Sequence, residues 1–177
     1  KHLQMKYSEK HRQEIAKMCR ENSIIIATHD DATAVHIKEG SALGATISEF
    51  PTTEDSARAA KKFKMDTVMG GPNIVRGGSH SGNVSASYLA ELDLLDALSS
   101  DYAPSSLLHS AFILNLKHGI QLPKAISKVT EVPAKMVGLS DRGVLKNGFR
   151  ADVLEVELTK DHIPIVHRAI SRGKRVI

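Results

Sequence analysis

Four short apolar runs in the sequence each end in polar side chains that could bind a metal ion or move a proton. His29 and Asp30 follow the first run, Glu49 the second, Asn73 the third and Asp101 the fourth. The carboxyl ends of parallel strands meet at one edge of a sheet, so neighbouring parallel strands would bring His29, Glu49 and Asp101 together. An imidazole nitrogen binds a divalent metal. A carboxylate can also bind it and accept a proton from the attacking water.

Each of these residues also has a purely structural interpretation. A single histidine at a strand end is often only a hydrogen-bonded structural residue. Asp101 could cap the helix that follows it or be a turn carboxylate before Pro104, and Asp30 and Asp31 could cap the helix after the first run. Glu49 could form a salt bridge with a neighbouring strand end. The residue types alone leave both interpretations open.

A glycine-rich segment follows the third run and carries a second kind of chemistry. Arg76 and His80 stand on either side of a glycine pair, Gly77 and Gly78, with Asn73 nearby. Glycines let phosphate oxygens approach the backbone N–H groups, and an arginine adds two parallel hydrogen bonds. The segment therefore favours polyphosphate binding, although many glycine-rich segments are simple loops.

Apolar periodicity and turn residues predict the elements that position these side chains. Continuous apolar runs predict strands, the first of them buried on both faces, and helical spacing predicts the segments between them. The predicted strands are residues 23–28, 44–48, 66–69 and 94–98. The predicted helices are residues 9–22, 31–38, 53–64, 85–92, 104–118, 123–130 and 133–137, with a loop at 70–83. We expect Gly40 to end the second of these helices and Thr53 to be the N-cap of the third. This alternation is typical of an α/β fold around a parallel sheet. The tail differs, since residues 151–158, 163–171 and 174–177 predict a small antiparallel appendix.

Composition excludes several classes of protein. The 177 residues carry a net charge of +4, and 41% are hydrophobic, so a disordered chain is excluded. Only 4% are aromatic, and the basic residues are dispersed, so we expect no nucleic-acid partner. No apolar run approaches a membrane span, and the first ten residues do not resemble a signal peptide.

The single cysteine gives a weak indication of compartment. Cys19 follows Ile15 and Met18 on the apolar side of the first predicted helix, and we expect it to be a small buried hydrophobic residue. A nucleophilic role would need a neighbouring base or positive field, and the sequence shows none. One cysteine cannot form an intrachain disulfide, which fits a reducing cytoplasm.

Four segments together resemble one enzyme family. They are Ala27–Thr33, Ile47–Thr53, the long stretch Met69–Asn83, and Leu98–Tyr102. They look like the amidohydrolase-superfamily diphosphatases of phosphonate breakdown in the carbon–phosphorus lyase pathway. The resemblance implies a metal-dependent hydrolase that releases pyrophosphate from an anionic triphosphorylated sugar phosphonate, ribose 1-methylphosphonate 5-triphosphate.

The resemblance also implies a fold and a set of site residues. Residues 1–139 would be the last βα units of a (β/α)8 TIM barrel, from about the sixth strand onward. Residues 140–177 would be C-terminal β-sandwich strands. His29 and Asp101 would hold one or two divalent ions, expected to be zinc, and Asp101 would take the proton of the attacking water. The substrate would contact the residues Asp30, Glu49, Asn73, Arg76, Gly77, Gly78 and His80.

One departure from the family affects the expected activity. Family members are roughly twice as long, and their first-strand and middle-strand metal ligands have no counterpart in this sequence. Two ligands rarely hold a catalytic metal tightly, so the isolated chain is expected to be inactive. The alternative is a non-catalytic α/β module whose unpaired sheet edges drive association with a further copy or another partner.

Overall fold

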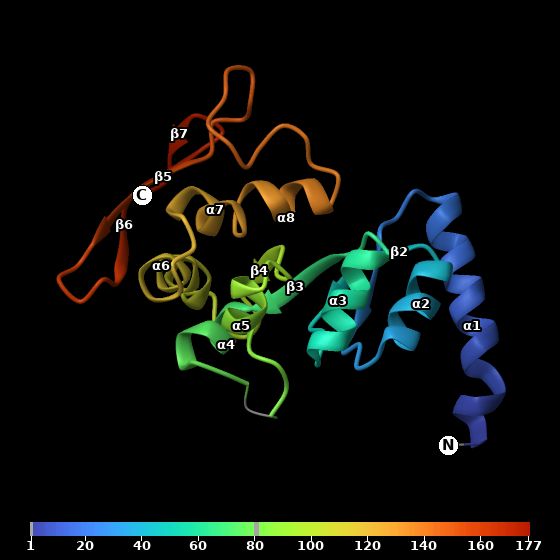
Figure 1. Ribbon diagram of the computed structural model, residues 1–177. Coiled ribbons are helices and arrows are strands. Elements are labelled where there is room, and N and C mark those ends of the chain that lie inside the picture. Colours follow the sequence, from blue (N-terminus) through green and yellow to red (C-terminus); the bar gives the residue numbers. More distant parts are fainter. Residues whose placement is uncertain (1, 80–81) are drawn as a thin grey trace. The chain divides into compact units, whose positions relative to one another are not determined.

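The computed structural model describes residues 2–79 and 82–177, with side chains from Tyr7 onward. The chain forms two compact units, one ending at Val68 and the other beginning at Met69. Both appear in Figure 1, the first in blue to green and the second in green to red.

The first unit is built from βα elements in the predicted alternation. Strands β1 (Ile26–His29), β2 (Ala45–Glu49) and β3 (Asp66–Gly70, which crosses into the second unit) are parallel neighbours in that order. Helix α1 (His2–Glu21) precedes β1, α2 (Ala34–Ala42) joins β1 to β2, and α3 (Glu54–Lys62) joins β2 to β3. Helices α2 and α3 pack side by side (Figure 1). The predicted parallel sheet is confirmed here.

Local side chains explain where α2 and α3 begin. The Thr33 side chain accepts a bond from the His36 N–H, so Thr33 is the N-cap of α2. Thr53 caps α3 as predicted and forms a reciprocal capping box with Ser56. Helix α2 continues past Gly40, where the sequence predicted its end. The glycine is explained instead by the close approach of α2 to β1 at this position. A Cβ there would lie 2.4 Å from Thr28 Cγ2 of β1.

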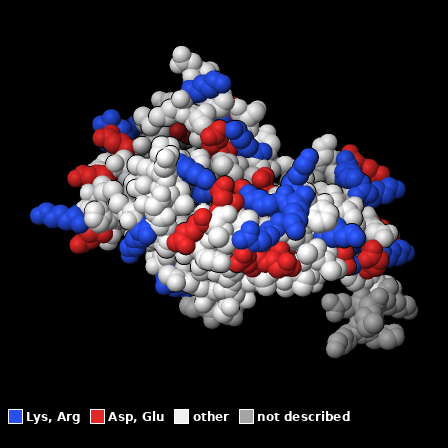
Figure 2. Space-filling view, viewed as in Figure 1, with Lys and Arg blue, Asp and Glu red and all other residues white. Residues whose placement is uncertain are grey.

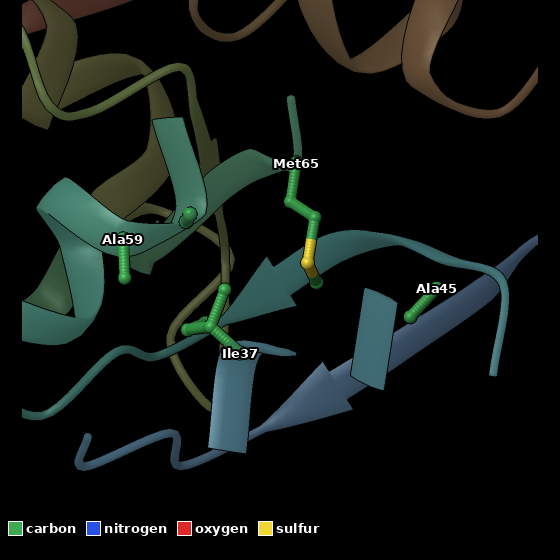
Figure 3. Packing of buried hydrophobic residues seen from close by; sticks show 5 residues of the cluster. Ile37, Ala45, Ala59 and Met65 are labelled. Atoms are coloured by element: carbon green, nitrogen blue, oxygen red, sulfur yellow. The ribbon is translucent and has the colours of Figure 1, made fainter. Parts of the chain in front are cut away.

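The core of the first unit lies between its sheet and the pair α2 and α3. Figure 3 labels four of its side chains, Ile37, Ala45, Ala59 and Met65, which belong to one hydrophobic cluster. Ile26 of β1 packs against this cluster. The small alanines let the helices approach the strands closely, and Ile37 and Met65 fill the remaining volume.

Two burial predictions for the first unit were wrong. Strand β1 alternates between half-buried and exposed residues instead of being buried on both faces, and Ile24 and Ile25 before it are exposed. On α1, Ile15 and Met18 are exposed, and the free Cys19 is only half-buried. A continuous apolar run shows that a strand is suited to burial, but a covering layer must be present to bury it.

After the end of β3, the second unit continues with a helix where the sequence predicted a loop. Helix α4 (Gly71–Arg76) occupies the first half of the segment 70–83, and α5 (Ala86–Glu91) follows. Next come β4 (Ala97–Ser99) and α6 (Ser106–His118), which packs against α4. Helices α7 (Leu122–Ser127) and α8 (Glu131–Met136) complete the helical part.

The antiparallel appendix is confirmed and belongs to the second compact unit. Strands β5 (Val153–Leu158), β6 (Pro164–Ser171) and β7 (Lys174–Arg175) form a three-stranded sheet in sequence order. The predicted boundary between residues 139 and 140 remains a prediction from the sequence.

On the face drawn in Figure 2, basic and acidic side chains are interspersed instead of forming a broad patch of one sign. Among the described residues, none of the helices has the length and apolar character needed to cross a membrane.

Candidate functional site

The carboxyl ends of β1 and β2 present polar side chains in register. His29 and Glu49 are partners in the parallel pairing, as the sequence predicted for neighbouring strands. The next residue of each strand, Asp30 (φ 58°) and Phe50 (φ 54°), adopts the left-handed conformation. We call these four residues, His29, Asp30, Glu49 and Phe50, the strand-end rim. A left-handed backbone is uncommon for aspartate and an outlier for phenylalanine, so surrounding contacts must hold it.

The His29 ring contacts Asp30 and Phe50, and its side chain is otherwise largely exposed. Its Nδ1 lies 3.1 Å from Asp30 Oδ2, and its ring meets the Phe50 ring edge-on at 5.2 Å between centroids. The side chain is 56% exposed. An imidazole whose Nδ1 pairs with a carboxylate presents Nε2 outward, the arrangement typical of metal-binding histidines. His29 therefore fits the role of a single metal ligand, and Asp30 orients it.

Asp31 forms a buried polar network that the sequence analysis did not predict. Its Oδ2 accepts bonds from Thr28 Oγ1 at 2.5 Å and from Ser48 Oγ at 2.6 Å. The side chain of Ser48 is fully buried, and Asp31 is 4% exposed. Neither Asp30 nor Asp31 is the N-cap of α2, because Thr33 has that role. The signal was present in the sequence as a hydroxyl residue at the end of each strand, but only the register brings the hydroxyls to one carboxylate.

Asp101 lies in the second unit, in the turn after β4. It is exposed and has a left-handed backbone (φ 49°), as Asp30 and Phe50 do. Its interpretation as a helix cap was wrong, since α6 begins at Ser106 and Ser105 is its N-cap, whereas its interpretation as a turn carboxylate before Pro104 is confirmed. An exposed carboxylate at a strand end fits the role of a metal ligand or proton acceptor. Asp101 and His29 belong to different units, so their predicted proximity stays a prediction from the sequence.

The predicted phosphate-binding segment is a capped helix end. Arg76 is the last residue of α4, and Gly77 (φ 81°) ends the helix in the left-handed conformation. The N–H groups of Gly77 and Gly78 donate to Ile74 O at 3.0 Å and Asn73 O at 2.8 Å. These glycines therefore offer open space beside Arg76, and their N–H groups are already used by the cap. We call Arg76, Gly77 and Gly78 the α4 cap.

The other residues of this segment have separate positions. The Arg76 guanidinium carbon lies 5.7 Å from the centroid of the Tyr102 ring, a cation–π contact. Asn73 Oδ1 accepts the Ala86 N–H at 2.9 Å, so Asn73 anchors the start of α5. His80, the remaining predicted contact, lies outside the described residues.

An open groove in the second unit lies beside Arg76. It has a volume of about 710 Å³, and its walls come from α4, the start of α6 and the β5–β6 hairpin. Arg76 and Tyr102 line it together with apolar residues such as Leu108, Leu154 and Ile163. No local pattern indicates this groove, since its walls are far apart along the chain.

The candidate metal ligands among the described residues do not form a cluster. Within residues 7–79 and 82–177, no three histidine, cysteine, aspartate or glutamate side chains form a group that could hold an ion. His29 and Asp101 each offer a donor that zinc accepts, an imidazole nitrogen and a carboxylate oxygen. A catalytic zinc needs at least three protein ligands, so these two residues alone would not hold one.

The chain is similar to a characterised enzyme along nearly its whole length. It is 49% identical over 176 residues to the alpha-D-ribose 1-methylphosphonate 5-triphosphate diphosphatase of Escherichia coli (strain K12), a hydrolase. The match covers 98% of this chain and 46% of the enzyme, so the chain spans about half the length of that relative. This homology confirms the resemblance to the phosphonate-breakdown diphosphatases. No protein-family model matches the chain.

Solved structures agree on the fold. N-acetylglucosamine-6-phosphate deacetylase from Pasteurella multocida aligns with a TM-score of 0.63 at 15% identity, over 93% of this chain and 53% of that protein. A metal-dependent hydrolase from Pyrococcus horikoshii aligns with 0.59 at 15% identity, over 94% and 38%. An amidohydrolase from Thermotoga maritima aligns with 0.54 at 18% identity, over 93% and 46%. The α/β arrangement with its antiparallel appendix is thus the arrangement of about half an amidohydrolase chain.

Proposed function

We propose that this chain supplies part of the active site of a metal-dependent hydrolase that releases pyrophosphate from ribose 1-methylphosphonate 5-triphosphate. The observation that carries the proposal is the 49% identity to the E. coli diphosphatase over 98% of the chain. The strand-end rim supports it, because it presents an oriented imidazole at a carboxyl strand end. We place the reaction in the cytoplasm, which the lone Cys19 fits.

His29 and Asp101 have the metal-binding roles in this proposal. His29 offers Nε2 while Asp30 holds Nδ1 at 3.1 Å, which fixes the direction of the ring. Asp101 offers an exposed carboxylate that binds the metal and accepts a proton from the attacking water. A bound zinc would lower the pKa of that water so that hydroxide is available near neutral pH. One or two ions fit the family, and their further ligands would be residues other than His29 and Asp101.

Arg76 is the substrate-binding cation of the α4 cap. Its guanidinium is exposed and rests on the Tyr102 ring, and none of the described carboxylates forms an ion pair with it. A guanidinium can give two parallel hydrogen bonds to a phosphate. A Cβ built at Gly77 or Gly78 would meet no atom within 4 Å, so phosphate oxygens have room beside it. We assign Asp30, Glu49, Asn73 and His80 to the remaining substrate contacts.

A chimera tests this proposal directly. This chain replaces the matching part of the E. coli diphosphatase, and pyrophosphate release is followed by phosphorus NMR with zinc present. We expect the chimera to hydrolyse the triphosphate, and Asp101→Asn to abolish release without changing the unfolding midpoint. A folded chimera without activity, or a fully active Asp101→Asn variant, would overturn the proposal.

A second function, an association module, is favoured by the exposed apolar residues near β1. Ile24 and Ile25 are 58% and 43% exposed, and Ile15 and Met18 of α1 are exposed as well. Apolar residues next to an edge strand promote pairing with another chain. Light scattering of the purified chain would detect a homo-oligomer, and Ile24→Lys should then restore the monomer. A monomer at every concentration would exclude self-association through these residues.

A further inference from the structure

We propose that Asp31 is a positioning residue, whose buried carboxylate fixes the strand-end rim and so aims His29. The structural part of this inference stands on the geometry alone. The part that concerns catalysis rests on the proposed function, through the role of His29 as a metal ligand.

The first observation is that Asp31 joins β1 to β2. Thr28 is the residue before His29, and Ser48 is the residue before Glu49. Both hydroxyls donate to the same oxygen, Asp31 Oδ2, at 2.5 and 2.6 Å. Thr28 and Ser48 are register partners, so Asp31 holds the two strands together immediately before the rim.

The second observation is that the Asp31 backbone ties the following loops together. Its carbonyl accepts the Thr52 N–H at 2.9 Å, and the next carbonyl, of Ala32, accepts Thr53 Oγ1 at 2.9 Å. The loop after β1 is therefore bonded to the loop after β2 on the far side of the rim. Asp30 and Phe50, the two left-handed residues, lie between these bonds and the network at Thr28 and Ser48.

Together these contacts explain how the rim keeps an unfavourable backbone. A left-handed non-glycine residue costs free energy and persists only when its surroundings determine it. Asp31 follows left-handed Asp30 directly and is 4% exposed, with its carboxylate fixed by a fully buried hydroxyl. The position of Asp30 sets the 3.1 Å contact with His29 Nδ1, and the position of Phe50 sets the edge-on contact with the His29 ring.

The geometry makes a specific prediction about which substitutions are tolerated. Because both hydroxyls bond one carboxylate oxygen, an asparagine with its amide oxygen in that place keeps both bonds. A leucine has nearly the same shape but accepts no hydrogen bond. Asp31→Asn should preserve the rim and Asp31→Leu should lose it, so the requirement is for an acceptor at this point and not for a carboxylate as such.

The experiment uses the ring current of Phe50 on the His29 ring protons, measured by NMR in the purified chain. The difference in the chemical shifts of these protons between wild type and Phe50→Leu defines the displacement that the Phe50 ring causes. We expect Asp31→Asn to keep that displacement and Asp31→Leu to lose most of it. Asp55→Ala is the control, because it removes the 3.2 Å bond to the Ala34 N–H at the start of α2 without touching the rim. It should lower the unfolding midpoint and leave the His29 displacement unchanged.

Two results would overturn the inference. One is a folded Asp31→Leu variant with the wild-type displacement, and the other is an Asp31→Asn variant that loses as much as Asp31→Leu. If Asp31→Leu does not fold, Ser48→Ala decides, since it removes one of the two bonds and should give a partial loss. An unchanged displacement in Ser48→Ala would then count against the inference. The readout needs no activity, so an inactive chimera with these shifts would overturn the proposed function alone.

Discussion

The strand-end rim and the α4 cap both present groups that could act on a phosphate, but the chain holds them in different ways. The rim rests on a buried carboxylate with two short hydroxyl bonds, and its backbone is left-handed at Asp30 and Phe50. The α4 cap ends a six-residue helix, with Arg76 exposed and resting on the Tyr102 ring. The rim is fixed from inside the fold, whereas the guanidinium is fixed only from the surface.

This difference matches the two tasks that the residues would have. A metal ligand must hold its direction within narrow limits, and buried bonds to its neighbours achieve that. A cation that follows phosphate oxygens benefits from a long side chain on an aromatic ring, which keeps its charge exposed. We therefore expect substitutions at the rim to affect the rate, and substitutions at the α4 cap to affect binding of the charged substrate.

The largest effect should follow loss of the rim imidazole. In the chimera, His29→Ala should lower the rate of pyrophosphate release by at least about 100-fold, because even partners of metal ligands cost about 10- to 100-fold. Zinc content of the purified variants, measured alongside the rate, should fall with it. Lys38→Ala on the exposed side of α2 is the control and should retain the parent rate. If His29→Ala stays within about threefold of the parent, the contrast between rim and cap disappears.

A double-mutant cycle tests whether the rim depends on close packing beneath it. A Cβ at position 40 would lie 2.4 Å from Thr28 Cγ2, and Thr28 cannot rotate away without losing its bond to Asp31. Gly40→Ala should therefore destabilise the chain by about 1–3 kcal/mol, despite the better helix propensity of alanine. Thr28→Ser removes Cγ2 and keeps the hydroxyl, so it should rescue most of that loss. Urea unfolding of the four proteins gives the coupling energy, and additive effects would contradict the model.

For the α4 cap we expect a binding effect of intermediate size. Arg76→Ala should weaken binding of a triphosphate about tenfold or more, because a charge-assisted hydrogen bond contributes about 1.5–3 kcal/mol. A monophosphate analogue should lose less. Lys146→Ala is a matched control, since Lys146 also lies over an aromatic ring, 5.4 Å from the Phe149 centroid. Calorimetric titration measures all three proteins, and equal losses for both ligands would show that Arg76 only orders its surroundings.

The smallest effect concerns a carboxylate held by a backbone N–H and a guanidinium instead of hydroxyls. The Arg172 backbone N–H, 2.9 Å from Asp152 Oδ1, and the Arg150 side chain lower the pKa of Asp152 below its ordinary 3.8. The stabilisation is therefore fully present above the ordinary pKa and is lost as the pH falls through the lowered value. Asp152→Asn should have a lower urea midpoint than wild type at about pH 6, and the gap should narrow by about pH 3. Asp161→Asn, in the exposed hairpin turn, is the control and should leave the urea midpoint unchanged.

Much of the fold could be predicted because its signals are local. Alternating apolar runs and capping residues predicted three parallel strands, the Thr53 cap and the antiparallel tail close to their observed limits. The motifs around His29, Arg76 and Asp101 also indicated the resemblance to the phosphonate-breakdown diphosphatases, and the chain is 49% identical to one of them. The segment 70–83 was predicted as a loop because its glycines outweighed the short helical run from Gly71 to Arg76. Exposure of Ile15, Met18 and Ile24 was missed, because periodicity shows an apolar face but not what covers it.

The sequence by itself determined which residue types stand at each strand end, since that depends only on chain order and local turn chemistry. It also determined the Thr53 cap of α3, because a threonine hydroxyl needs only an N–H three residues away. Only the tertiary structure decided that Thr28 and Ser48 share one oxygen of Asp31, because strand register joins residues that are far apart in the chain. The same holds for Gly40, which is required by the approach of α2 to β1 and not by the end of a helix. Contacts of this kind depend on packing distances, and no local pattern in the sequence records them.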